Sequence, residues 1–166
     1  MSTSRKLLIL GGTVLAALGM LYGLLYAVFV EHQTLDRMGG TLAGAFTYAA
    51  EGHQEGSEAR LMIYREIRFD YVRQVDVHSH WIGLAMLMIM LGAAFDEVTL
   101  PERTRLWIAV AMLTGSVIFP FGVLLQTVKH EAAWTVSGSV LAVAGSGLVI
   151  IALAATALGF MRGGAA

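Results

Sequence analysis

LLILGGTVLAALGMLYGLLYAVFV, Leu7–Val30, is a run of 24 residues without a charge. A helix with a rise of ~1.5 Å per residue covers ~36 Å over this run, which exceeds the ~30 Å hydrocarbon core of a bilayer. The run is too long for the apolar region of a signal peptide, and it continues into Glu31 and His32 without a small-residue cleavage site. It therefore predicts an uncleaved membrane span.

Three further apolar segments follow. Leu106–Val128 and Ala132–Met161 are uncharged and long enough to span. Trp81–Phe95 has only 15 residues, about 22 Å of helix, so this span has to begin near Val77 and carries polar side chains at its apolar boundary. We therefore predict an all-α polytopic protein, a single membrane domain over residues 1–166, whose four transmembrane helices form an antiparallel bundle with spans at about 7–30, 77–95, 106–128 and 132–161.

Composition agrees with the membrane prediction and excludes several functions. The chain is 57% hydrophobic and 14% charged, with a mean hydropathy of +0.69, which is typical of a membrane protein rather than a soluble globule. The absence of cysteine excludes disulfides, thiolate ligands, covalently attached c-type haem and iron–sulfur clusters. A net charge of −1 argues against nucleic-acid binding.

The positive charges divide almost evenly between the two faces of the predicted bundle. The face with the termini has five and the other face has six: Arg5, Lys6, Arg103, Arg105 and Arg162 against Arg37, Arg60, Arg65, Arg68, Arg73 and Lys129. Because the first span usually dominates orientation, we expect both termini to be cytoplasmic and the protein to lie in the bacterial inner membrane as a multi-pass protein.

The first extracytoplasmic loop, residues 31–76, is the only sizeable polar segment. Its pattern predicts two amphipathic helices, Thr34–Ala50 and Glu58–Val75, separated by a Gly52–Ser57 break. We expect them to lie at the bilayer interface as a lid over the bundle. Their apolar stripes comprise Leu35, Met38, Leu42, Phe46 and Ala49 in the first helix and Leu61, Tyr64, Ile67, Tyr71 and Val75 in the second.

All five histidines fall at this same face, and the run Asp76-Val-His78-Ser-His80 enters the second span. If the run is extended, the two histidines point the same way and can chelate zinc or copper with Asp76 and His130. If it is helical, they diverge by about 200°, and His80 becomes an axial haem ligand with His130. Both geometries remain open from sequence.

Further candidate residues lie at the same face. His32 follows the first span, and His53 lies in the break between the amphipathic helices. Three arginines of the second helix can contact lipid phosphates or pair with haem propionates; they are Arg65, Arg68 and Arg73.

The segment His78-Ser-His80-Trp-Ile-Gly-Leu, together with the Gly-rich last span that begins near Ser137-Gly138, resembles small four-helix bacterial inner-membrane proteins with an H-x-H pair opening the second helix. More distantly it is similar to the haem-binding helices of haem-copper oxidase-like membrane proteins. The resemblance covers about the last ninety residues and implies haem bound by histidine. The 31–77 segment lies outside it, and the chain lacks the many further helices and histidines of an oxidase catalytic subunit.

From these features we expect a membrane protein that binds b-type haem near its outer face, for electron transfer with a redox partner or for sensing a small ligand. One alternative is a cofactor-free accessory subunit of a larger membrane complex. In that case the small-residue faces would mediate contacts in the complex or a homo-oligomer; they comprise Gly19 and Gly23 in the first span and Gly138, Ala142 and Ser146 in the last. A second alternative is a divalent copper or zinc binding or transport protein.

Overall fold

The computed structural model describes residues 1–128 and 132–163, and these residues are helical almost throughout. The helices are α1 (Thr3–Tyr26), α2 (His32–Ala50), α3 (Gln54–Ala94), α4 (Glu102–Leu125) and α5 (Ala132–Gly163), with a π-helical turn, η1 (Ala27–Glu31), and a 3₁₀ turn, η2 (Phe95–Glu97). Within the described residues, four helical stretches are long and apolar enough to cross a membrane: Thr3–Ala50, Gln54–Glu97, Glu102–Leu125 and Ala133–Arg162. The all-α class and the four apolar helices are thereby confirmed.

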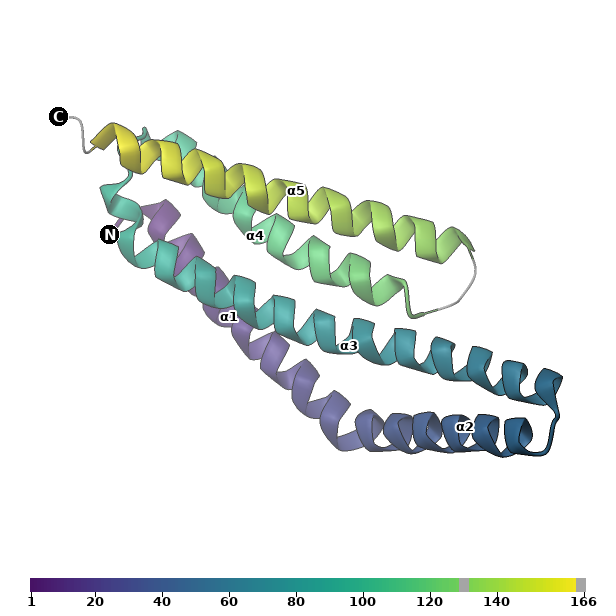
Figure 1. The fold of residues 1–166 in the computed structure, drawn as a ribbon. Coiled ribbons are helices and arrows are strands. Elements are labelled where there is room, and N and C mark those ends of the chain that lie inside the picture. The colour runs from purple at the N-terminus through teal and green to yellow at the C-terminus, as the bar shows by residue number, and fades with distance from the viewer. Residues whose placement is uncertain (129–131, 164–166) are drawn as a thin grey trace.

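The segment predicted as the first extracytoplasmic loop differs from the expected lid. α1 continues through η1 into α2, and α3 is a single helix of 41 residues, about 62 Å long. Figure 1 shows α2 and the N-terminal half of α3 as a helical hairpin that projects beyond α4 and α5. Since α3 has no break between Val75 and Val77, its first half cannot turn to lie across the bundle.

The face of α2 that packs against α3 is also rotated from the predicted stripe. Ala45 is 2% exposed, whereas the adjacent Phe46, which was predicted to lie on the apolar stripe, is 68% exposed. A small side chain at the contact lets two helices approach closely, so the alanine, rather than the larger ring, lies inside the hairpin. The stripe predicted on α3 is better placed, because Ile67 is buried there.

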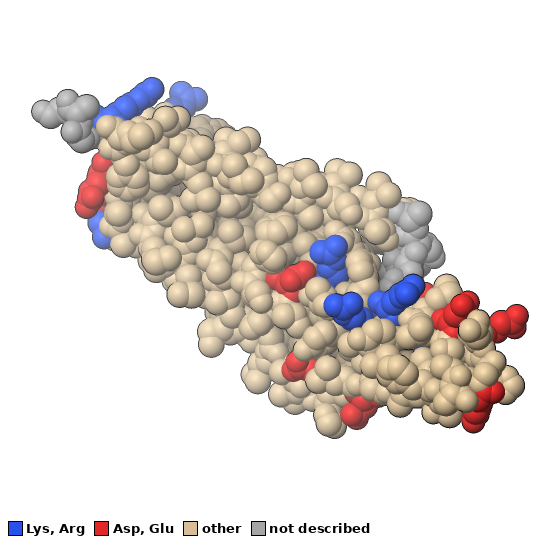
Figure 2. Space-filling view, in the orientation of Figure 1, with Lys and Arg blue, Asp and Glu red and all other residues tan. Residues whose placement is uncertain are grey.

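Charge is concentrated at the two ends of the molecule. Figure 2 shows Lys, Arg, Asp and Glu over the hairpin and at the opposite end, with an uncharged surface between them on the face that is drawn. Large apolar side chains are exposed along this middle part, among them Leu18 in α1 and Val143 in α5. Such a surface is typical of contact with lipid.

The helices pack in two close pairs, α1 with α3 and α4 with α5, and α4 also contacts α1 and α3. Glycine makes both pairs possible. A Cβ at Gly12 of α1 would lie 2.8 Å from the Ala85 carbonyl of α3, and one at Gly138 of α5 would lie 2.6 Å from the Gly122 carbonyl of α4. Gly138 and the buried Ala142 therefore face α4, and Gly145, rather than the predicted Ser146, extends this seam.

A polar network fastens the end that carries the N-terminus. The Ser4 amide and hydroxyl donate to Glu102 over 2.9 and 3.1 Å, and Arg105 pairs with the same carboxylate at 2.9 Å. Arg5 pairs with Asp96 at 3.0 Å. The starts of α1 and α4 and the end of α3 are thereby held together.

Candidate functional site

The Asp76–His80 run is helical, and the side chains of its two histidines contact different helices. The Nδ1–H of His78 donates to the Gly19 carbonyl of α1 over 2.9 Å. The Nδ1–H of His80 donates to the Asp76 carbonyl over 2.6 Å, and its ring meets the Phe119 ring of α4 edge to face at 4.6 Å. The pair is therefore not arranged to hold one metal ion together.

Other predicted ligands lie apart from this run. His32 is highly exposed and faces Asp36 at 3.5 Å, and His53 contacts the Tyr48 ring at the hairpin tip. His130 lies outside the described residues. Within residues 1–128 and 132–163, no group of three His, Asp or Glu side chains is placed to hold a metal ion.

The three predicted arginines share one surface of α3. Arg65, Arg68 and Arg73 line a shallow pocket of about 420 Å³ together with Phe69 and Val72. The Arg73 guanidinium lies over the Phe69 ring, 5.1 Å from its centre, and is 3.8 Å from Asp76. The pocket is not lined by His78 or His80.

A more enclosed cavity among the described residues lies elsewhere, where α1 bends through η1 into α2. Its volume is about 640 Å³, and its wall is formed by α1, η1, α2, α3 and the turn that follows α4. We call it the interfacial cavity. Four aromatic side chains line it: Tyr22, Tyr26, Phe29 and Tyr71. π-Helical turns are rare and frequently occur at functional sites, and η1 lies at the bend between α1 and α2, where its Phe29 and Val30 line the cavity.

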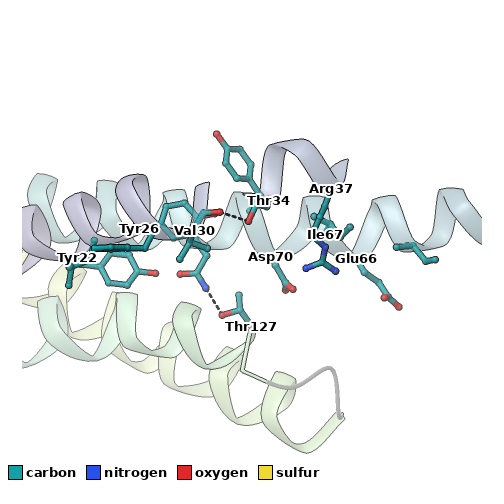
Figure 3. Close-up of a pocket in the computed structure, with 14 residues that line it drawn as sticks. Tyr22, Tyr26, Val30, Thr34, Arg37, Glu66, Ile67, Asp70 and Thr127 are labelled. Atoms are coloured by element: carbon teal, nitrogen blue, oxygen red, sulfur yellow. Dashed lines mark hydrogen bonds between the residues drawn. The ribbon is translucent and has the colours of Figure 1, made fainter. Parts of the chain in front are cut away.

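The cavity has an apolar end and a charged end. Figure 3 shows Tyr22 at one end, and Arg37, Glu66 and Asp70 toward the other. Because Leu25 and Phe29 line the cavity and are 49% and 65% exposed, its apolar wall is open to the outer surface of α1.

Two hydrogen bonds brace the cavity. The Tyr71 hydroxyl donates to Glu31 over 3.1 Å and ties α3 to η1, while the Gln74 amide donates to Thr127 over 2.9 Å and ties α3 to the end of α4. The hydrogen bond to Glu31 and burial raise the pKa of Tyr71, so this hydroxyl remains a donor at neutral pH. The cavity is thus held by polar contacts at the level where the helices separate.

Tyr22 closes the apolar end. Its ring stacks on Tyr26 at 6.4 Å and meets Trp81 edge to face at 5.4 Å. The hydroxyl oxygen is covered and has no hydrogen-bond partner among the described residues. A buried hydroxyl without a partner is unfavourable. The hydrogen-bonding capacity of the Tyr22 hydroxyl is therefore left unused, whereas that of the Tyr71 hydroxyl is satisfied by Glu31.

This cavity was not predicted from the sequence, although two signals for it exist. Glu66, Asp70 and Gln74 recur at four-residue spacing, which places them along one face of a helix, and Tyr22 and Tyr26 have the same spacing in the first span. Neither signal shows that the two faces meet.

Comparison with protein-family models, with curated proteins and with solved structures gave no match for this chain. Its function therefore has to be inferred from its own side chains.

Proposed function

We propose that this protein is a multi-pass membrane protein that binds an amphiphilic small molecule in the interfacial cavity. In this proposal the four apolar helices cross the bacterial inner membrane as an antiparallel bundle, with both termini cytoplasmic and the α2–α3 hairpin outside. Lipid surrounds the exposed apolar faces of α1 and α5.

The observation that carries the proposal is the position of the cavity along the helices. Uncharged sequence ends at Val30 in the first span and begins at Val77 in the second. The cavity extends across this boundary, with Tyr22 on the apolar side and Arg37 and Glu66 on the charged side. A ligand that fills it has to be apolar at one end and polar at the other.

The exposed wall offers a route from the bilayer. Leu25, Phe29 and Val30 line the cavity and belong to the outer surface of the first span. An amphiphile dissolved in the outer leaflet can reach these side chains without crossing water, because its tail remains in an apolar environment throughout. Binding would then cost only the ordering of the ligand and of the cavity wall.

Filling the cavity tests the proposal. Leu25→Trp adds an indole to the cavity wall, and Leu24→Trp adds the same group to a neighbouring residue that does not line the cavity and is 61% exposed. We expect native mass spectrometry of the detergent-purified protein, titrated with phosphatidylethanolamine, to show one retained lipid in the parent and in Leu24→Trp. Leu25→Trp should bind at least about tenfold more weakly, the equivalent of ~1.4 kcal/mol. Equal retention by all three would contradict the proposal.

A second candidate function, b-type haem binding at His80, is favoured by the orientation of that imidazole. Its Nδ1–H donates to the Asp76 carbonyl, an arrangement that leaves Nε2 as the ligating nitrogen. Arg73 lies seven residues away on the same helical face, and a Cβ at Gly83 would meet nothing within 4 Å. His80 would hold the iron, Arg73 would pair with a propionate, and haem would supply one-electron redox chemistry.

The optical spectrum separates this candidate from the remaining alternatives. Haem bound through His80 predicts a Soret band that His80→Ala removes and His78→Ala retains, because the two rings face different helices. A colourless protein without bound metal would instead favour the cofactor-free accessory subunit. Copper or zinc bound by His78 and His80 together has less support, because the helical run separates them.

A further inference from the structure

Two exposed arginines on one face of α3, Arg65 and Arg68, form no ion pair within the described residues. They line the shallow pocket of about 420 Å³ described above. Arg73 lines the same pocket, but its guanidinium already pairs with Asp76 and lies over the Phe69 ring. The guanidinium groups of Arg65 and Arg68 are therefore available to an anion from outside the chain.

The neighbouring helices pack against other sides of α3. α2 covers the side of the buried Ile67, and the turn after α4 contacts Gln74 through Thr127. With about 100° of rotation per residue, Arg65 and Arg68 lie about 100° to 180° around the helix from both Ile67 and Gln74. Since Glu58 shares a neighbouring pocket with Arg65, we place the anion closest to Arg68.

Two hydrogen bonds between helices fix the level of Arg68 relative to the apolar surface. Tyr71 contacts Glu31, where the uncharged run of the first span ends. Gln74 contacts Thr127, near the end of the third uncharged run. Arg68 lies three residues beyond Tyr71, about 4.5 Å along α3. Because the headgroup layer is about 5 to 8 Å thick on each side of the hydrocarbon core, Arg68 lies at headgroup level in the proposed bundle.

The same face of α3 continues into the span as an apolar surface. Val75 and Met86 follow Arg68 by about two and five helical turns, so all three side chains lie within about 20° of one another around the helix. Val75 and Met86 are both exposed. An arginine at headgroup level with apolar side chains below it matches a molecule that carries a phosphate above acyl chains.

We infer that this face of α3 binds an anionic phospholipid of the surrounding leaflet, with the phosphate at Arg68 and Arg65 and the acyl chains along Val75. Guanidinium groups bind phosphate oxygens in bidentate pairs, and basic residues beside a span are typical of sites for anionic lipids. This site is separate from the interfacial cavity, because the two share no lining residue. The inference therefore goes beyond the proposed function and does not depend on it.

Two phospholipids with the same acyl chains provide the test. Phosphatidylglycerol has a net negative charge and phosphatidylcholine has none, although both contain a phosphate diester. Native mass spectrometry of the protein in a neutral detergent, titrated with each lipid, measures the preference between them. We expect the parent to bind phosphatidylglycerol at least about tenfold more tightly, because the guanidinium groups attract its net charge.

Two glutamine variants report the location of the lipid. Arg68→Gln should reduce the preference about threefold to tenfold, the effect of one basic residue at an anionic membrane surface. Arg60→Gln removes the same charge from the same helix, but Arg60 lies beside Gly44 of α2 and does not line the pocket. It should leave the preference unchanged. Equal binding of the two lipids by the parent, or equal effects of the two variants, would overturn the inference.

Two further measurements separate the other possible occupants and sites. Displacement of phosphatidylglycerol by inorganic phosphate would show that the arginines bind a free anion, and the lipid assignment would be wrong. Leu25→Trp changes only the wall of the interfacial cavity, so it should retain the preference. If it abolishes the preference, the anionic lipid lies in that cavity, and the inferred site on α3 is wrong while the proposed function stands.

Discussion

Replacing Gly23 by alanine should dislodge His78 from α1. The imidazole occupies the space beside Gly23 on α1, and a Cβ at Gly23 would overlap the ring at Nδ1, Cε1 and Nε2. Because the backbone of α1 is held by its own helical hydrogen bonds, the ring has to move. The movement breaks the 2.9 Å hydrogen bond to the Gly19 carbonyl.

The expected cost follows from three contributions. Loss of the hydrogen bond costs about 1 kcal/mol, and displacement of a packed ring costs about 1 to 3 kcal/mol. Alanine in place of glycine inside a helix returns about 1 kcal/mol. Gly23→Ala should therefore destabilise the protein by about 1 to 3 kcal/mol, from the sum of these terms.

Gly83→Ala is the matched control. Gly83 lies on the same long helix as His78, and an added Cβ would meet nothing within 4 Å. Only the helix-propensity gain of about 1 kcal/mol remains. The two variants should thus differ by about 2 to 4 kcal/mol, although each adds one methyl group to a helical glycine.

Unfolding in mixed micelles of dodecyl maltoside and sodium dodecyl sulfate, followed by circular dichroism, measures this difference. In a double-mutant cycle, Gly23→Ala should cost much less once His78→Ala has removed the ring. If Gly23→Ala unfolds at the same dodecyl sulfate fraction as Gly83→Ala, the docking of His78 against α1 is refuted. A full cost of Gly23→Ala in the absence of the ring would refute it as well.

Two other predictions concern topology and acid stability. A cysteine introduced at Ser57, near the hairpin tip, should react with an impermeant thiol reagent in intact cells, whereas one at Thr104, beside the terminal network, should react only after permeabilisation; the reverse pattern would invert the proposed orientation. Hydrogen bonds from Ser2 and Arg5 lower the pKa of Asp96 from 3.8 to about 2, so its stabilising contribution is present above pH ~4 and is lost as the pH falls toward 2. Asp96→Asn cannot titrate and should lose less stability in this window, as measured by acid unfolding; identical acid profiles would show that the contact does not contribute.

The positions of the apolar helices could be predicted because the signal is local. An uncharged run such as Leu7–Val30 has to avoid water over its whole length, and a helix satisfies its backbone within the segment itself. The short run Trp81–Phe95 also predicted that the second apolar helix begins before Trp81, and α3 does include His78 and His80. The packing face of the last helix at Gly138 and Ala142 could also be predicted from the sequence, because small residues at four-residue spacing lie on one face of a helix.

The candidate sites were less predictable, because they depend on which faces meet. The Asp76–His80 run is compatible with both an extended and a helical backbone, and only the continuity of α3 decided that its two histidines diverge. On α2 the residue that packs against α3 is Ala45, one position before the predicted Phe46. Which of the two is buried depends on how closely α3 approaches, and the sequence of α2 alone does not determine that distance.

By itself, the sequence determined the all-helical class, the four apolar helices and the placement of polar side chains beyond their ends, because each depends on the transfer of a contiguous segment out of water. Only the tertiary structure decided that the first loop is a projecting hairpin, that His78 lies against Gly19, and that Tyr22, Arg37 and Glu66 surround one cavity. These features depend on the angle at η1 and on contacts between residues distant in the chain, such as Glu31 with Tyr71 and Gly19 with His78. Hydropathy and helical periodicity describe each segment alone and do not encode such contacts.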